Sequence, residues 1–212
     1  MLLEGRNAVI YGGGGAIGGA VARAFAREGA HVHLAGRTLG PLQRAAEQVR
    51  AAGGVAEVAQ VDALDERAVD EHADQVAAQA GSIDVCCNLI SHGDVQGTPL
   101  VEMSLGDFER PVVTAVRTMF LTSRAAARHM IRQGSGVILV FGGYGDPPPG
   151  YNLGGLQVAF QAMEALRRSL AAELGPHGIR VVTCRRAGCP RRSRGASRGW
   201  RPSSTTWWKG RC

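Results

Sequence analysis

A run of four glycines near the amino terminus is the part of this sequence with the clearest potential for chemistry. Gly12, Gly13, Gly14 and Gly15 follow an apolar segment, and a helical pattern begins at residue 17. A strand, a tight glycine turn and a helix amino terminus form a phosphate cradle, because backbone N–H groups and the positive end of the helix dipole face the turn. A Cβ atom there would hold a pyrophosphate away and resist positive φ. The pattern predicts dinucleotide binding; a glycine-rich loop without a ligand is the alternative.

Strands and helices are expected to alternate along the chain around this loop. Short apolar runs bounded by glycine or polar residues predict strands, and longer stretches with a 3.6-residue apolar period predict helices. Strands are expected at residues 7–11, 31–35, 55–61, 83–89, 137–141 and 179–183. Helices are expected at 17–28, 39–52, 66–79, 99–103, 105–132 and 155–174. This alternation predicts an α/β fold, a Rossmann-type doubly wound parallel sheet in three layers with about six strands.

The carboxyl ends of the predicted strands define one expected binding rim. Ligands of doubly wound sheets bind outside those ends. The segments that follow the strands are 12–17, 36–37, 62–63, 88–91 and 142–144. One extended cofactor could therefore contact residues that are far apart in the sequence.

Composition indicates a single globular domain of an ordinary kind. The 212 residues are 45% hydrophobic, enough for one α/β core. No apolar run reaches the ~18 residues of a membrane span, and the amino terminus lacks a signal-peptide pattern, so a cytoplasmic location is expected. Cys86 and Cys87 are adjacent within a predicted strand and would face opposite ways, so we interpret them as buried small hydrophobes rather than metal ligands.

The charge of the chain is divided very unevenly. The net charge is +6, yet all 18 acidic residues precede residue 184, and nine of the 24 basic residues follow it. Residues 184–212 also hold all three tryptophans and three of the five cysteines, without apolar periodicity. We therefore divide the chain into a nucleotide-binding domain at 1–183 and a basic, disordered or out-of-frame tail at 184–212. A frameshift near residue 184 and a basic arm for nucleic acid are the two interpretations of the tail.

The spacing of these features resembles the short-chain dehydrogenase/reductase (SDR) family over residues 5 to about 183. That family holds pyrophosphate with a Gly-x-x-x-Gly-x-Gly loop, matched here by Gly12, Ala16 and Gly18, with alanine at the middle position. The resemblance implies a dimer or tetramer formed through the helices at 105–132 and 155–174. It also implies that the family's last strand is missing from this sequence.

The same resemblance implies which residues contact the cofactor. NAD-preferring members end the second strand with an acid, whereas this chain has Gly36 followed by Arg37, which favours NADP(H) over NAD(H) because arginine can bind a 2′-phosphate. Asp62 matches the aspartate that receives the adenine amino group. A solvated surface arginine and a helix-cap aspartate are the alternatives for these two residues. The implied contacts are Gly12, Gly14, Gly15, Ile17, Gly18, Arg37, Asp62, Ala63 and Asn88.

The catalytic tetrad of the family is absent from the matching positions. The family uses Asn, Ser, Tyr and Lys, and the ungapped resemblance around residues 167–181 places these positions at Ala115, Gly143, Leu156 and Phe160. The only lysine of the chain is Lys209, so an alignment shift cannot restore the missing one. Tyr144 and Tyr151 are candidate substitute acids, and aromatic packing at a loop tip is their alternative. His92 could titrate at the rim, or be a plain polar loop residue.

Three functional hypotheses follow from this pattern. The first is an NADP(H)-dependent oxidoreductase of the SDR type that acts on a carbonyl/alcohol pair. The second is a nucleotide-binding or partner-binding protein without turnover. The third is a damaged gene product of such an enzyme. Substrate identity is not readable, because the family carries that information in a carboxyl-terminal loop that this sequence does not show.

Overall fold

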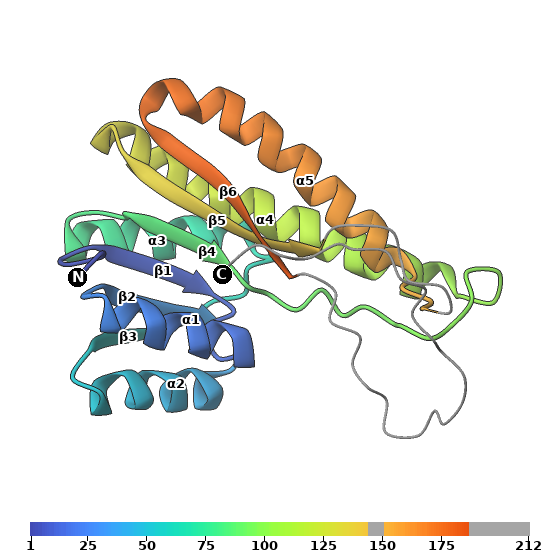
Figure 1. The fold of residues 1–212 in the computed structure, drawn as a ribbon, viewed down its shortest axis with the longest axis horizontal. Helices are drawn as coiled ribbons and strands as arrows, with labels where there is room; N and C mark the ends of the chain where they lie inside the picture. The colour runs from blue at the N-terminus through green and yellow to red at the C-terminus, as the bar shows by residue number, and fades with distance from the viewer. Residues whose placement is uncertain (144–150, 187–212) are drawn as a thin grey trace, which may run out of the picture.

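The structure is a computed structural model that describes residues 1–143 and 151–186, with the side chains of the last two left out. Six parallel strands form one sheet in the order β3-β2-β1-β4-β5-β6 (Figure 1). The chain therefore builds outward from β1 to β3, returns to the middle, and builds outward again from β4 to β6. The strand order reverses between β1 and β4, which is where doubly wound sheets bind ligands.

The strands at the centre of the sheet are buried on both faces. β1 (Asn7–Tyr11) and β4 (Val85–Asn88) are buried at every residue, as expected of parallel strands covered by helices on both sides. The remaining strands are β2 (His31–Gly36), β3 (Val55–Gln60), β5 (Gly136–Gly143) and β6 (Ile179–Arg186). The predicted parallel sheet of about six strands is confirmed.

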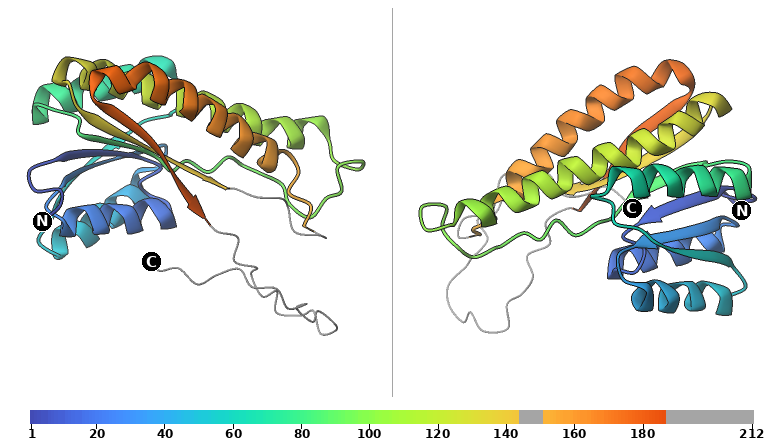
Figure 2. Two further views of the ribbon diagram at one scale, coloured as in Figure 1. Left: turned by 45° about the horizontal axis from the view of Figure 1, so that its top comes forward. Right: turned by 180° about the vertical axis from the view of Figure 1, so that it is seen from behind.

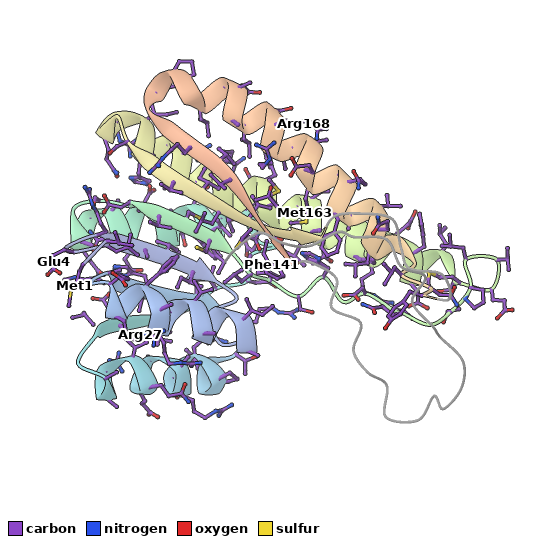
Figure 3. The ribbon with its side chains drawn as sticks, in the orientation of Figure 1. Met1, Glu4, Arg27, Phe141, Met163 and Arg168 are labelled. Atoms are coloured by element: carbon purple, nitrogen blue, oxygen red, sulfur yellow. The ribbon has the colours of Figure 1, made fainter. Side chains whose placement is uncertain are left out.

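Five helices cover the two faces of the sheet (Figure 2). α1 (Ala16–Arg27) and α2 (Leu39–Ala51) pack on one face over a core that includes Ile10 and Leu34. α3 (Glu66–Ala80), α4 (Leu105–Gln133) and α5 (Gly155–Leu174) pack on the other face. Met163 of α5, labelled in Figure 3, is 2% exposed and belongs to this second core. A short 3₁₀ turn at Gly175–His177 leads from α5 to β6.

The cysteine pair behaves as the strand geometry predicts. Cys86 belongs to the core under α3, α4 and α5, and Cys87 to the core under α1 and α2, so the two thiols face opposite sides of the sheet. Burial raises the pKa of both thiols, which keeps them protonated. In the described part of the chain, no group of three or more His, Cys, Asp or Glu side chains could hold a metal ion.

The predicted helix at 99–103 is wrong. This segment forms two overlapping turns instead, in which Glu102 N donates to Pro99 O (3.0 Å) and Met103 N donates to Leu100 O (3.4 Å). Five residues offer too few hydrogen bonds to offset the cost of starting a helix. A separate helix begins only after Ser104, whose hydroxyl accepts from Asp107 N.

The last two strands are longer than predicted. β5 runs to Gly143 and β6 to Arg186, so each extends past its predicted end at residues 141 and 183. They pair in parallel along their whole length. Most of the basic tail, residues 187–212, lies outside the described residues. Among the helices described, none is long and apolar enough to span a membrane.

Candidate dinucleotide site

A cavity of about 550 Å³ opens at the carboxyl ends of β1, β2, β3 and β4. Six of the nine predicted cofactor contacts line it: Gly12, Gly14, Gly15, Arg37, Asp62 and Ala63. The wall on the α4 side is formed by Arg110, Thr114 and Thr118. A larger open groove of about 950 Å³ lies between α3 and α4, but its six carboxylates would repel the phosphates of a dinucleotide. The smaller cavity is therefore the candidate site.

Two glycines of the loop are required by close packing of the backbone itself. Gly12 adopts φ +83°, and a Cβ there would come within 2.5 Å of the carbonyl oxygen of Leu89. A Cβ on Gly18 would collide with the carbonyl oxygen of Gly12. Gly12 N donates to Ala35 O at 2.8 Å, which ties the turn to β2. The turn, β4 and α1 are thereby brought together at the switch point of the sheet.

The amino terminus of α1 offers unpaired backbone donors to the cavity. Its N-cap is Gly15, which has no side chain to accept from the first-turn N–H groups, and the first turn contains no acid. α3 and α4 differ, because Asp65 and Ser104 cap them with side-chain hydrogen bonds. An anion is the natural partner of such an uncapped helix end. The cradle therefore fits the pyrophosphate of a dinucleotide.

The end of β2 presents positive charge without a compensating carboxylate. Gly36 and Arg37 line the cavity, and the guanidinium of Arg37 has no hydrogen bond or ion pair to any described residue. The backbone carbonyl of Arg37 accepts from Gln60 Nε2 at 2.9 Å, which fixes this turn against β3. Thr38 is the predicted N-cap of α2, but its hydroxyl makes no capping bond. This corner fits a phosphate group.

Asp62 lies at the wall of the cavity, whereas Asn88 lies beneath it. Asp62 lines the cavity, and Oδ1 of its carboxylate accepts from Leu64 N at 3.0 Å. The N-cap of α3 is Asp65, so Asp62 is not the capping residue of that helix. Asn88 is 5% exposed and does not line the cavity: its amide donates to Thr118 Oγ1 (3.2 Å) and Thr122 Oγ1 (3.3 Å). Asn88 fastens β4 to α4 beneath the site.

The remaining two predicted contacts also lie off the cavity wall. Ile17 is 45% exposed on the first turn of α1, and Gly18 is buried against the Gly12 turn. Their backbone N–H groups belong to the same uncapped helix end as the cavity-lining glycines. Any contact they make with a cofactor would be through the backbone rather than a side chain.

The four positions that the resemblance assigns to the family's tetrad carry no side chain that could transfer a proton. Ala115 is fully buried in α4, and Leu156 is 8% exposed at the start of α5. The ring of Phe160 lies directly over Gly143, where any Cβ would collide with it. Tyr151 is 43% exposed and does not line the cavity, and Tyr144 lies outside the described residues.

His92 lies at the far wall of the cavity. It lines the cavity, and its ring meets that of Phe160 edge to face, with 6.1 Å between the ring centroids. Burial lowers its pKa, with a smaller opposing effect from Asp94. His92 is therefore neutral near pH 7 and packs as an aromatic ring.

A buried polar group beneath the site was missed by sequence reasoning. The Tyr11 hydroxyl lies 3.1 Å from Nδ1 of His72, and Tyr11 lines the cavity at the end of β1. Burial lowers the pKa of His72 to about 4, with a smaller contribution from His33. A visible signal existed, since His72 falls on the apolar stripe of α3 with Val69, Ala73 and Val76.

Comparison with known proteins agrees with this geometry. Residues 14–187 match the family described as enoyl-(acyl carrier protein) reductase. A probable galactose dehydrogenase, GalD of Rhizobium meliloti, is 32% identical over 180 residues, which cover 84% of this chain and 70% of that protein. The chain belongs to the short-chain dehydrogenase/reductase family of oxidoreductases.

Solved structures with bound cofactor show the same fold. A metagenomic short-chain oxidoreductase in complex with NADP aligns with a TM-score of 0.79 at 28% identity, covering 89% of this chain and 85% of that one. An NAD⁺-bound xylitol dehydrogenase also aligns with a TM-score of 0.79 at 29% identity, covering 86% of this chain and 70% of that one. Because both cofactors occur among these neighbours, the choice between them has to be argued from the residues of this chain.

Proposed function

We propose that this chain binds NADP(H) in the cavity at the carboxyl ends of β1 to β4. The observation that carries the proposal is the corner formed by Gly36 and Arg37, where a free guanidinium stands in place of a carboxylate. An acid at the strand end would repel a 2′-phosphate, whereas arginine binds one through two parallel hydrogen bonds. The uncapped end of α1 would hold the pyrophosphate, and Asp62 would accept from the adenine amino group.

The reaction that this proposal implies is oxidoreduction of a carbonyl/alcohol pair. A bound nicotinamide supplies or accepts the hydride, and the protein has to supply the proton. The described residues at the four tetrad positions hold no such group, and Tyr151 stands away from the cavity. These observations favour a second candidate function, in which the chain binds the dinucleotide without turning over a substrate.

Titration with NADP⁺ and NAD⁺ tests the binding proposal. We expect NADP⁺ to bind at least about tenfold more tightly, because the 2′-phosphate gains a charge-assisted pair. Arg37→Ala should remove that preference, and the surface variant Arg44→Ala, in α2, should keep it. Binding of neither nucleotide contradicts the proposal, and equal affinity contradicts the assignment to Arg37.

Consumption of NADPH over a panel of aldehydes and ketones separates the two candidate functions. Turnover that survives Tyr151→Phe but is lost with Tyr144→Phe would assign the acid to Tyr144 and support the oxidoreductase. Binding of NADPH without consumption across the panel would support the protein without turnover. The two tyrosine variants serve as controls for each other because both lie in the same connection between β5 and α5.

We also propose that the chain assembles as a homodimer or homotetramer through α4 and α5. These helices pack against each other on the outer face of the sheet (Figure 2). Exposed apolar side chains lie on both helices, Val113 (57%) and Phe120 (43%) on α4 and Val158 (44%) on α5. A second copy would remove them from water.

A further inference from the structure

The face of the sheet that α1 and α2 cover continues onto β5 and β6. α1 and α2 pack on β1, β2 and β3, whereas the described helices that pack on β5 and β6 are α4 and α5, which lie on the opposite face (Figure 1). Parallel sheets are covered by other structure on both faces, because both faces of their strands are apolar. One face of β5 and β6 therefore needs a cover from outside the five described helices.

Side chains alternate between the two faces along both strands. Ile138 and Val140 of β5 and Val181 of β6 point into the core beneath α4 and α5, and each is at most 5% exposed. The residues that alternate with them lie on the other face and are half-buried or exposed: Val137, Leu139 and Phe141 of β5, and Val182 and Cys184 of β6. We call these five residues the β5–β6 patch.

The β5–β6 patch is apolar and continuous across the two strands. The parallel register places Leu139 beside Val182, and it places Phe141, which Figure 3 labels, beside Cys184. On its other side, Leu139 lies next to Cys87 of β4 and packs against the core beneath α1 and α2. Val182 is 47% exposed although it lies in the middle of a strand. A partner that removes this surface from water would stabilise the protein.

The segment that directly continues β6 has the length and composition to cover this patch. Residues 187–212 contain all three tryptophans of the chain, Trp200, Trp207 and Trp208. Tryptophan is among the side chains that bury the largest apolar area when they leave water. The eight residues of β6 are about 26 Å long, whereas the segment can span about 85 Å when extended, so it can turn back over the patch.

Charge and connectivity favour this segment over a second copy of the chain. Residues 187–212 carry seven basic residues and no acid, whereas residues 1–183 carry 15 basic and 18 acidic residues, so the two parts attract each other. Because the segment is covalently joined to β6, its effective concentration at the patch is on the order of millimolar. A second copy reaches that level only in concentrated protein.

We infer that residues 187–212 dock on the β5–β6 patch and bury tryptophan side chains against it. The inference is independent of nucleotide binding, because none of the five patch residues lines the candidate cavity. It gives the basic segment a binding partner within its own chain. An arm for nucleic acid would instead present its tryptophans to solvent, where they could stack on bases.

Tryptophan fluorescence tests this inference, since every tryptophan of the chain lies in the segment. Excited where tyrosine does not absorb, the full-length protein should emit at shorter wavelengths than a peptide of residues 187–212. Acrylamide should quench the protein at least about threefold less than the peptide, because docked rings are shielded. Equal quenching of protein and peptide overturns the inference. Shielding that disappears when the protein is diluted assigns the cover to a second copy and also overturns it.

A charge on the patch tests where the segment docks. Val182→Lys replaces an apolar contact with a positive charge that repels the basic segment, so acrylamide quenching should rise at least about twofold. Val55→Lys is the matched control: this valine is 48% exposed on β3, at the other edge of the sheet, and its replacement should leave quenching unchanged. Circular dichroism verifies that both variants fold. Equal quenching of the two variants overturns docking on the β5–β6 patch.

Discussion

Single glycines decide whether the nucleotide cradle can form at all. Gly12 combines a positive φ with close approach to the backbone of Leu89, so its requirement comes from the fold before any ligand is considered. The sequence pattern singled out Gly12 and Gly18 for the approach of pyrophosphate, whereas the structure shows that both are also required by packing. Their packing role depends on β4 and α1 meeting the turn, which is a tertiary contact that no local pattern contains.

The substitution Gly12→Ala should destabilise the protein by about 3 kcal/mol or more, since it adds both backbone strain and a collision. Gly106→Ala is the matched control in the first turn of α4, where no atom lies within 4 Å of an added Cβ. It should be neutral or stabilise by up to about 1 kcal/mol, because alanine favours the helix. Thermal unfolding measures both. Equal melting temperatures for the two variants would argue against the packing role.

Elements differ in how far their own sequence determines them. α5 was predicted at its observed bounds, because glycine precedes it, a long apolar period runs through it, and Gly-Pro follows it. The segment 99–103 was mispredicted because five residues that begin with a proline offer too few hydrogen bonds to offset the cost of starting a helix. The contact of Phe160 with Gly143 was also beyond the sequence, since it depends on how α5 sits against β5.

A buried histidine of α3, His72, lies between this helix and the sheet, and its burial makes the stability of the protein sensitive to acid. His72 has its pKa lowered by burial from 6.5 to about 4, so the folded state binds its proton less readily than the unfolded chain. The contribution of neutral His72 to the free energy of unfolding is complete above pH 6.5 and is lost as the pH falls towards 4. The full loss is about 3 kcal/mol.

Replacement of this histidine should flatten the acid side of the stability profile. His72→Gln keeps a polar partner for the Tyr11 hydroxyl but cannot titrate, so urea midpoints should fall less between pH 6.5 and pH 4.5 than in the unmodified protein. His177→Gln, at an exposed site after α5, should leave the profile unchanged. Parallel profiles for His72→Gln and the unmodified protein would contradict the role of His72.

At the scale of the whole molecule, the two halves of the sheet differ in the residues that they present at their carboxyl ends. The half built on β1, β2 and β3 keeps glycine, arginine and aspartate around an open cavity. The half built on β5, β6 and α5 has Gly143, Leu156 and Phe160 at the positions to which the resemblance assigns three of the family's proton-transfer groups. The family and the sheet were predictable from the sequence, because the glycine loop and the alternation of elements are local signals. The contact of Phe160 with Gly143 was not, because it is a tertiary contact between α5 and β5.

The outer face of α4 makes the molecule's assembly testable. Val113 and Phe120 lie seven residues apart and therefore on one face of the helix. The guanidinium of Arg124 stacks on the Phe120 ring, with 5.4 Å between its Cζ atom and the ring centroid. Phe120→Asp places a charge in the proposed interface and should weaken self-association at least about tenfold. Leu39→Asp, an equally exposed apolar residue on α2, is the control and should not change it. Sedimentation velocity over a range of concentrations, with circular dichroism to verify folding, measures the effect. An unmodified protein that stays monomeric throughout, or a Phe120→Asp variant that assembles as well as the control, would exclude this face as the interface.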